Sequence, residues 1–369
     1  MYKNLVLPAS LLAGTIIGAG IFALPFVFMK AGIIAGLFYL IVFCLVFILI
    51  HLMYAEVIIK TDGDHNFPGY VRVYLGRRGF WLANLTSILG LFLILLIYLV
   101  LSLSFLNLIL PAGSGISDIF KIMFFWLIGS AAIFLATKRL VFSEFLTTSG
   151  IVLIALLLFV LGIFNFDKII SIRTFNLKNI FLPYGVILFS LMGRVAIPSV
   201  IRYFKKIGQP VAGAKKAIIL GTSIPAFVYL LFVFGILGLS GSVSEDAVSG
   251  LINSVNPIIL VLVGVFGFIS VLDSYNVVGL DIKNSLSLDL KFSRFWAGSI
   301  VVILPLLLFW LGLSNFLELA GIIGGVFIAL EGILIGLMYL KLPDKKFSPI
   351  LPYILILVFI GGIVYKLVY

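Results

Sequence analysis

The chain has 369 residues, of which 63% are hydrophobic and only 11% are charged, and its mean hydropathy is +1.31. This composition leaves too little polar surface to cover a water-soluble globule, so it predicts an integral membrane protein. The net charge of +11 comes from short Lys and Arg clusters between apolar runs, which is typical of loops at an anionic membrane face and indicates no nucleic-acid partner. The single cysteine, Cys44, excludes an intramolecular disulfide, and the sequence has no CxxC pattern that would hold a metal.

Apolar stretches divide the chain into about eleven predicted membrane spans, since a hydrocarbon core of about 30 Å needs roughly 20 apolar residues per helix. The first stretch is too long for a signal peptide's apolar region and lacks a cleavage-like end, so it is interpreted as a span. In chain order the predicted spans are Leu5–Met29, Gly32–Ile59, Phe80–Leu110, Ile119–Thr137, Leu140–Phe164, Phe181–Phe204, Gly213–Leu239, Leu251–Leu280, Arg294–Leu313, Phe316–Leu340 and Pro349–Val368.

Lys and Arg are distributed unequally between the two sets of loops. With the N-terminus inside, the inner loops carry about three times as many as the outer loops. The sequence therefore predicts a multi-pass protein of the cell membrane with a cytoplasmic N-terminus and, because the span number is odd, an external C-terminus. The basic inner segment Thr61–Gly79 is expected to contain a short helix lying on the membrane surface.

A Gly/Pro motif occurs in the first and sixth predicted spans. GTIIGAGIFALP runs from Gly14 to Pro25, and LMGRVAIP runs from Leu191 to Pro198; both fit G-x-x-A-[L/I]-P. Glycine and proline weaken a helix, and two interrupted helices in corresponding halves of a chain indicate a transporter's binding site. The two copies cross the membrane in opposite directions, which predicts an inverted repeat of residues 1–164 and 181–340, with a further helix at 349–368.

The motifs carry a resemblance to a known family. GTIIGAGIFALP, the inner-loop segment FPGYVRVYLGRRG, FLPYGVILFSLMGRVAIPSV and DSYNVVGLDIKNSLSLDL together resemble the amino acid permeases of the amino acid–polyamine–organocation superfamily. The nearest branch contains the tyrosine/tryptophan/serine permeases and related amino acid transporters. The resemblance implies an all-α, LeuT-type fold with five-plus-five inverted repeats and broken helices 1 and 6, and proton- or sodium-coupled uptake of an amino acid.

A substrate site is predicted at the two interruptions, because unpaired backbone groups persist in a membrane only where a ligand or protein groups satisfy them. Freed amides bind a carboxylate and freed carbonyls coordinate a cation. The alternative is a close helix contact through glycines. Tyr98 and Phe189 have either a substrate-contacting or a packing role. The candidate substrate-binding residues are Ile17, Gly18, Ala19, Gly20, Tyr98, Phe189, Ser190, Gly193 and Arg194.

Arg194 departs from the resembling permeases, in which this position is usually small or apolar. An arginine at membrane depth is expected to face a cavity and to have a partner. It either clamps a substrate carboxylate, which would favour an acidic substrate, or is neutralised internally, or reaches the inner surface with Arg202. Glu331 and Glu318, in span ten, are candidates for an outer vestibule or gate.

Asp273 and Ser274 occupy the place where the resembling family commonly has a Thr-Ser pair that completes a sodium site. By position, the resemblance adds the carbonyls of Gly14 and Ile17 to this ion site. Asp273 has three alternative roles: strengthening a sodium site or carrying the coupling proton, pairing with Arg194, or lining a solvated inner vestibule.

An ion-coupled secondary transporter is the function that these features favour. No Walker A loop or catalytic cluster of His, Asp and Glu is present in the sequence, so an ATP-driven pump and a membrane enzyme are disfavoured. An exchanger, a sensor or a channel-like protein is the alternative. The expected partners are an amino acid, the lipid bilayer and Na⁺ or H⁺ as coupling ion, with no other cofactor and no obligatory protein partner.

Overall fold

The computed structural model is mainly helical in the part of the chain that it describes. That part comprises residues 5–110, 115–135, 141–165, 167, 169, 172, 174–210, 213–252 and 254–368, with the backbone alone at 135, 141–146, 288 and 289. No strand is present among these residues, which confirms the predicted all-α class.

The helices follow the predicted spans in order. The first span is divided into α1 (Leu7–Ile16), η2 (Ala19–Ala23) and α2 (Leu24–Ala31), and the sixth into α8 (Pro183–Ser190), η4 (Arg194–Ala196) and α9 (Ile197–Lys206). The other helical segments are α3 (Ile33–Lys60), α4 (Phe67–Ile109), α5 (Asp118–Leu135), α6 (Val141–Ile163), α10 (Ala214–Leu239), α11 (Pro257–Asn284) with η7 (Ser285–Asp289), α12 (Arg294–Trp310), α13 (Phe316–Ile322) with η8 (Ile323–Ile328) and α14 (Ala329–Leu340), and α15 (Ile350–Val368). Two short turns, η3 (Leu177–Asn179) and η6 (Ser249–Leu251), lie in connections.

Length and hydropathy support a multi-pass membrane protein. Within the described residues, seven helices or continuous helical stretches are long and apolar enough to cross a membrane, and the bent pair at the start of the chain makes an eighth. Two further apolar helices, at Thr147–Ile163 and Arg294–Trp310, are shorter. The number of eleven crossings therefore remains a prediction.

The predicted surface helix is continuous with the third span. Asn66 caps the start of α4 by accepting a hydrogen bond from the Gly69 N–H at 3.0 Å. Gly76 then has φ 73° and ψ −166°, a conformation that only glycine adopts readily, so α4 changes direction there. The sequence predicted the helix in this connection but not its junction with the span.

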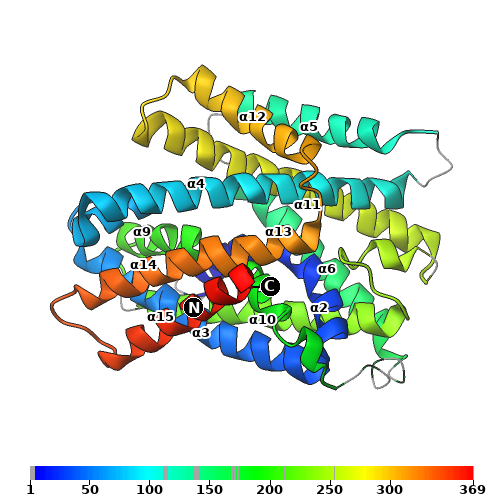
Figure 1. Cartoon of the computed structure of the whole chain (residues 1–369), viewed down its shortest axis with the longest axis horizontal. Coiled ribbons are helices and arrows are strands. Elements are labelled where there is room, and N and C mark those ends of the chain that lie inside the picture. The colour runs from blue at the N-terminus through cyan, green and yellow to red at the C-terminus, as the bar shows by residue number, and fades with distance from the viewer. Residues whose placement is uncertain are drawn as a thin grey trace.

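The long helix α4 lies across the middle of the molecule (Figure 1), with α5 and α12 on one side of it. It packs against α11, α12 and α14, whereas α10 packs against α6, α1 and α3. Helix α8 lies so close to η8 that a Cβ on Gly324 would collide with the backbone of Gly185. Small residues allow this approach, which is a common device at helix contacts in membranes.

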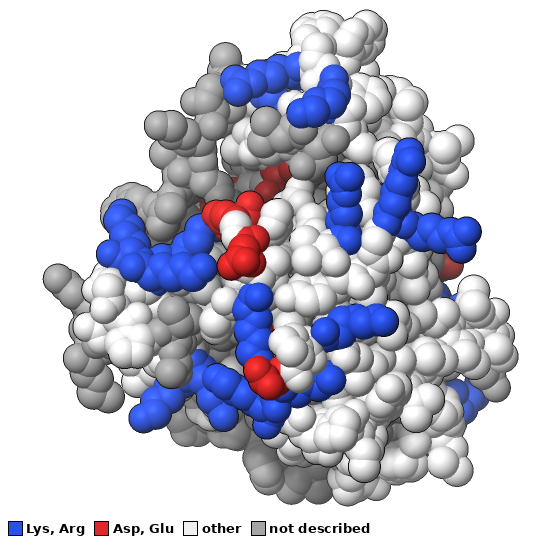
Figure 2. All heavy atoms as spheres, turned by 90° about the vertical axis from the view of Figure 1, so that its left-hand side faces the viewer, with Lys and Arg blue, Asp and Glu red and all other residues white. Residues whose placement is uncertain are grey.

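One end of the molecule is rich in basic side chains. The start of α4, the end of α9 and the connection between α14 and α15 lie at the left of Figure 1, and Lys and Arg are spread over that face, with a smaller group of carboxylates among them (Figure 2). We refer to this end as the basic face. The segments that form it contain Arg72, Arg77, Arg78, Lys205, Lys206, Lys341, Lys345 and Lys346.

Candidate functional site

The first predicted helix interruption is present. The last backbone hydrogen bond of α1 comes from the Ile17 N–H, and Ile17 and Gly18 then have non-helical backbone conformations. The chain bends by 52° between α1 and the helical segment that follows. Among the described residues, the N–H groups of Gly18 and Ala19 donate to no backbone carbonyl. The interruption thus leaves amide donors for a bound acceptor.

The second interruption lies between α8 and η4. Met192 and Gly193 are outside any helix, and the next backbone hydrogen bond runs from the Ala196 N–H to the Gly193 carbonyl at 3.1 Å. The two halves of this span nevertheless form one nearly continuous stretch from Pro183 to Lys206. It is therefore a straighter interruption than the first.

The two interruptions contact each other. The Ser190 hydroxyl lies 2.9 Å from the Gly20 carbonyl, and the buried Tyr229 hydroxyl lies 2.8 Å from the Ile16 carbonyl and 2.7 Å from the Ser190 carbonyl. A Cβ on Gly20 would be 2.5 Å from the Ser190 Cα. Only glycine at position 20 permits this approach, so the motif glycine holds the first broken helix against the second.

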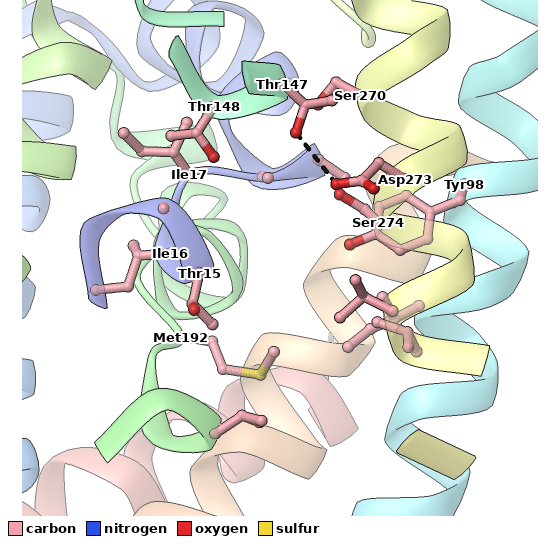
Figure 3. A pocket seen from close by; sticks show the side chains of 18 of the residues that line it. Thr15, Ile16, Ile17, Tyr98, Thr147, Thr148, Met192, Ser270, Asp273 and Ser274 are labelled. Carbon is pink, nitrogen blue, oxygen red and sulfur yellow. Dashed lines mark hydrogen bonds between the residues drawn. The ribbon is translucent and has the colours of Figure 1, made fainter. Parts of the chain in front are cut away.

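A cavity of about 90 Å³ lies between the two interruptions and α4, α6 and α11 (Figure 3). Most of the predicted site residues line it, namely Gly14, Ile17, Gly18, Ala19, Gly20, Tyr98, Phe189, Asp273 and Ser274. We call this the central cavity. Ser190 and Gly193 do not line it, because the Ser190 hydroxyl turns to the Gly20 carbonyl and Gly193 packs against Ile16. Met192 and Val195 line it in their place.

Asp273 is held by a threonine that sequence reasoning missed. The Thr147 hydroxyl, from α6, lies 3.2 Å from the Asp273 carboxylate, and Figure 3 shows Tyr98 and Ser274 beside it. Thr148 also lines the central cavity. The available signal was the run of hydroxyl residues Thr147, Thr148 and Ser149 within a predicted span.

The oxygen atoms around Asp273 match a monovalent cation. Asp273, Ser274, Thr147 and Thr148 line the cavity, as do residues 14–18 around the interruption of α1. Hard cations prefer oxygen ligands of this kind. Within the described residues, no group of three His, Cys, Asp or Glu side chains is arranged to hold a metal ion. The donor set therefore suits Na⁺ or a proton on Asp273.

Arg194 has a different partner from the one considered from the sequence. Its Nε and Nη2 donate to the two carboxylate oxygens of Glu331, each at 2.7 Å, and the Ser87 hydroxyl donates to Glu331 at 2.9 Å. The guanidinium also lies 4.1 Å from the ring centre of Phe67. Pairing of Arg194 with Asp273 is thus wrong, because η4 and α14 bring Arg194 and Glu331 together.

Arg194 lines a second cavity instead of the central one. This second cavity has a volume of about 350 Å³ and reaches Asp64 and Arg202, which are exposed at the basic face. Leu91, Val195 and Asp281 line both cavities. The second cavity therefore lies between the central cavity and the basic face.

Known proteins resemble this chain in sequence and in fold. The sequence profile of the tryptophan/tyrosine permease family matches residues 1–367. Glutamine transporter 2 of Aliivibrio fischeri is 24% identical over 345 residues, which cover 87% of this chain and 85% of that protein. This relative is similar over most of the length of both chains.

Solved transporters share the fold at low sequence identity. MhsT in complex with L-phenylalanine gives a TM-score of 0.69 at 16% identity, covering 97% of this chain and 98% of MhsT. The manganese transporter of Eremococcus coleocola, in complex with an aromatic bis-isothiourea compound, gives a TM-score of 0.69 at 13% identity. The match covers 99% of this chain and 86% of that transporter. Mhp1, a nucleobase-cation-symport-1 transporter in a closed conformation with bromovinylhydantoin, gives a TM-score of 0.63 at 14% identity. The match covers 98% of this chain and 90% of Mhp1.

These similarities establish the LeuT-type fold and exclude an enzyme. With the profile match over almost its whole length, the chain is a member of the tryptophan/tyrosine permease family and a multi-pass membrane transporter.

Proposed function

We propose that this protein is a secondary active transporter that carries a neutral amino acid together with Na⁺ or H⁺ by alternating access. The observation that carries the proposal is the central cavity, where two interrupted helices meet opposite the Asp273 carboxylate. Freed amides on one side and a carboxylate on the other complement a zwitterion and a coupling cation. Family membership supports an amino acid as the substrate.

The substrate carboxylate is assigned to the N–H groups of Gly18 and Ala19. They begin the helical segment that leads into α2, and a helix N-terminus carries a partial positive charge. Ile94, Phe189 and Met192 give the cavity an apolar wall that suits an uncharged side chain. The names of the family and of the glutamine transporter relative support a neutral amino acid.

An acidic substrate is not favoured, because its only specific support was a substrate-binding role for Arg194. The Arg194 guanidinium donates two hydrogen bonds to Glu331, and Arg194 lines the second cavity. Within this pair the two opposite charges compensate each other, which offsets the cost of burying them. Arg194 is therefore assigned to a structural role beside the substrate path.

Coupling is assigned to Asp273 with Ser274, Thr147 and the carbonyls near Gly14 and Ile17. A Na⁺ ion bound there would be held by oxygen ligands from α1, α6 and α11. A proton would reside on the Asp273 carboxylate. In either case the cation neutralises a carboxylate at membrane depth, which couples cation binding to closure of the cavity.

The proposed orientation places the basic face in the cytoplasm, according to the positive-inside rule. This gives a cytoplasmic N-terminus and, with eleven crossings, an external C-terminus in the cell membrane. Residues 1–164 and 181–340 form the two inverted repeats of this proposal, and 349–368 form the added helix. Figure 2 supports the assignment through the density of Lys and Arg on this face.

Counterflow in proteoliposomes tests the proposal. Vesicles containing the purified protein are loaded with one unlabelled amino acid, and uptake of the labelled form is followed with and without Na⁺ at two pH values. A transporter gives transient accumulation that requires internal substrate and increases with the coupling cation. Accumulation without any cation dependence identifies an exchanger, uptake without accumulation identifies a channel, and no uptake with any amino acid refutes the proposal.

A further inference from the structure

Helix α11 presents a row of polar side chains to both cavities. Ser270, Asp273 and Ser274 line the central cavity, and Asp281 lines both cavities. Ser285, the first residue of η7, lines the second cavity. Their spacing places them along one side of the helix. Asp273 and Asp281 are eight residues apart, which corresponds to about 12 Å along the helix axis. The row thus leads from the proposed coupling site toward the basic face.

Asp281 is the carboxylate at the junction of the two cavities. Asp281 is partly buried, and its side chain forms no hydrogen bond and no ion pair with any other described residue. The Arg194 charge attracts it, but that guanidinium already binds both oxygens of Glu331. Within the described part of the chain, Asp281 therefore presents, to a solute that moves between the cavities, a carboxylate that makes no hydrogen bond.

The other charged groups around the second cavity are arranged in pairs. Arg194 pairs with Glu331, and Arg202 pairs with Asp64 at 3.2 Å. These pairs cancel two positive and two negative charges, so among the described residues that line the cavity the Asp281 carboxylate is the unbalanced one; His65 also lines it. A carboxylate in such surroundings attracts a cation and repels a free anion.

We infer that Asp281 is a second cation-binding residue, located on the path between the central cavity and the basic face. It takes a monovalent cation that leaves the central cavity, either the ammonium group of the amino acid or the coupling cation. Both have the same chemistry toward a carboxylate. The inference rests on the proposed function and extends it by placing a release site on the basic-face side of the central cavity.

Transport measured from each face tests this site. Membrane vesicles of the two orientations are prepared, with sidedness established by labelling a cysteine introduced at exposed Lys345 in a Cys44→Ala background. Asp281→Asn should raise the half-saturating concentration on the basic face by about tenfold, because a charge-assisted contact is lost. The value on the opposite face should change by less than about twofold.

The half-saturating concentration that Asp281→Asn changes, that of the amino acid or that of the ion, identifies which cation Asp281 binds. An effect on the half-saturating amino acid concentration at saturating cation identifies the ammonium group, and an effect on the half-saturating Na⁺ or H⁺ concentration identifies the coupling ion. Asp281→Glu should retain much of the basic-face affinity, and Asp344→Asn, which changes an exposed carboxylate at the same face, should have no effect.

Equal shifts on both faces, or no shift on either face, would overturn the inference. Should Asp281→Asn fail to fold, Asp281→Ser provides the same comparison, with folding checked by size exclusion and thermal unfolding. Absence of counterflow by the unmodified protein would instead refute the proposed function. The two failures are thus distinguishable.

Discussion

Arg194 and Glu331 form a two-point ion pair between η4 and α14, with both nitrogen–oxygen distances at 2.7 Å. Their side chains are 12% and 8% exposed, so the pair is largely removed from solvent. Ser87 on α4 adds a third helix to the contact. The pair therefore connects the segment after the second helix interruption to two other helices, beside the path from the central cavity.

Removing one member of this pair is predicted to destabilise the protein. Glu331→Gln or Arg194→Ala leaves a buried charge without its partner, which typically costs about 3–5 kcal/mol. Thermal unfolding in detergent should show a large decrease in melting temperature. Arg202→Ala removes an exposed pair with Asp64 and should cost less than about 1 kcal/mol. Equal effects of the two changes would contradict this account.

Gly20→Ala and Gly18→Ala are predicted to have different effects on stability and on amino acid binding. Gly20→Ala places a Cβ 2.5 Å from the Ser190 Cα, so the backbone must move, at about 1–3 kcal/mol. At Gly18 the nearest group to an added Cβ is the Tyr98 hydroxyl at 3.8 Å. Gly18→Ala should therefore keep the melting temperature but weaken amino acid binding severalfold, since the methyl lies at the cavity wall. Melting and equilibrium binding of labelled amino acid distinguish the two effects.

Tyr229→Phe is predicted to loosen the contact between the two interruptions. The hydroxyl reaches the carbonyls of Ile16 and Ser190, and its loss leaves buried acceptors without a donor. An unsatisfied buried group costs about 1–3 kcal/mol. Tyr353→Phe, at a residue 57% exposed, is the matched control and should leave unfolding unchanged. A stable Tyr229→Phe protein with unaltered binding would show that this bridge is dispensable.

Asp273→Asn is predicted to separate cation dependence from amino acid binding. The amide keeps the shape of the carboxylate but cannot neutralise a cation or carry the coupling proton. Thermal stabilisation by the amino acid should persist while its dependence on Na⁺ or pH disappears. Thr147→Val removes only the 3.2 Å hydroxyl contact and should give a smaller change in cation affinity. Persistence of full cation dependence in Asp273→Asn would exclude this coupling role.

Much of the fold is predictable from the sequence because hydrophobic length and Gly/Pro placement act locally. The interruptions at Ile17 and Met192 follow from residues within each span, and their opposed directions follow from counting spans. The partner of Arg194 is not predictable in this way. Glu331 is 137 residues away, and the rotation of α14 about its axis depends on packing around π-helical η8.

The candidate site, like the fold, is predictable from the sequence only in part. Backbone groups near Gly18 and side chains on one face of α11 are placed by helix geometry, so their convergence is predictable. Ser190 satisfies the criteria for a substrate residue in the sequence, but its rotamer directs the hydroxyl to the Gly20 carbonyl. Thr147 contributes to the site only because α6 packs against α11.

The most direct measurement of the central claim is an experimental structure with the transported amino acid bound. The account predicts interrupted helices at Ile17 and Met192, with the substrate carboxylate at the N–H groups of Gly18 and Ala19 in the central cavity. Continuous helices through these positions, or an amino acid bound elsewhere with no solute density between the two interruptions, would contradict it.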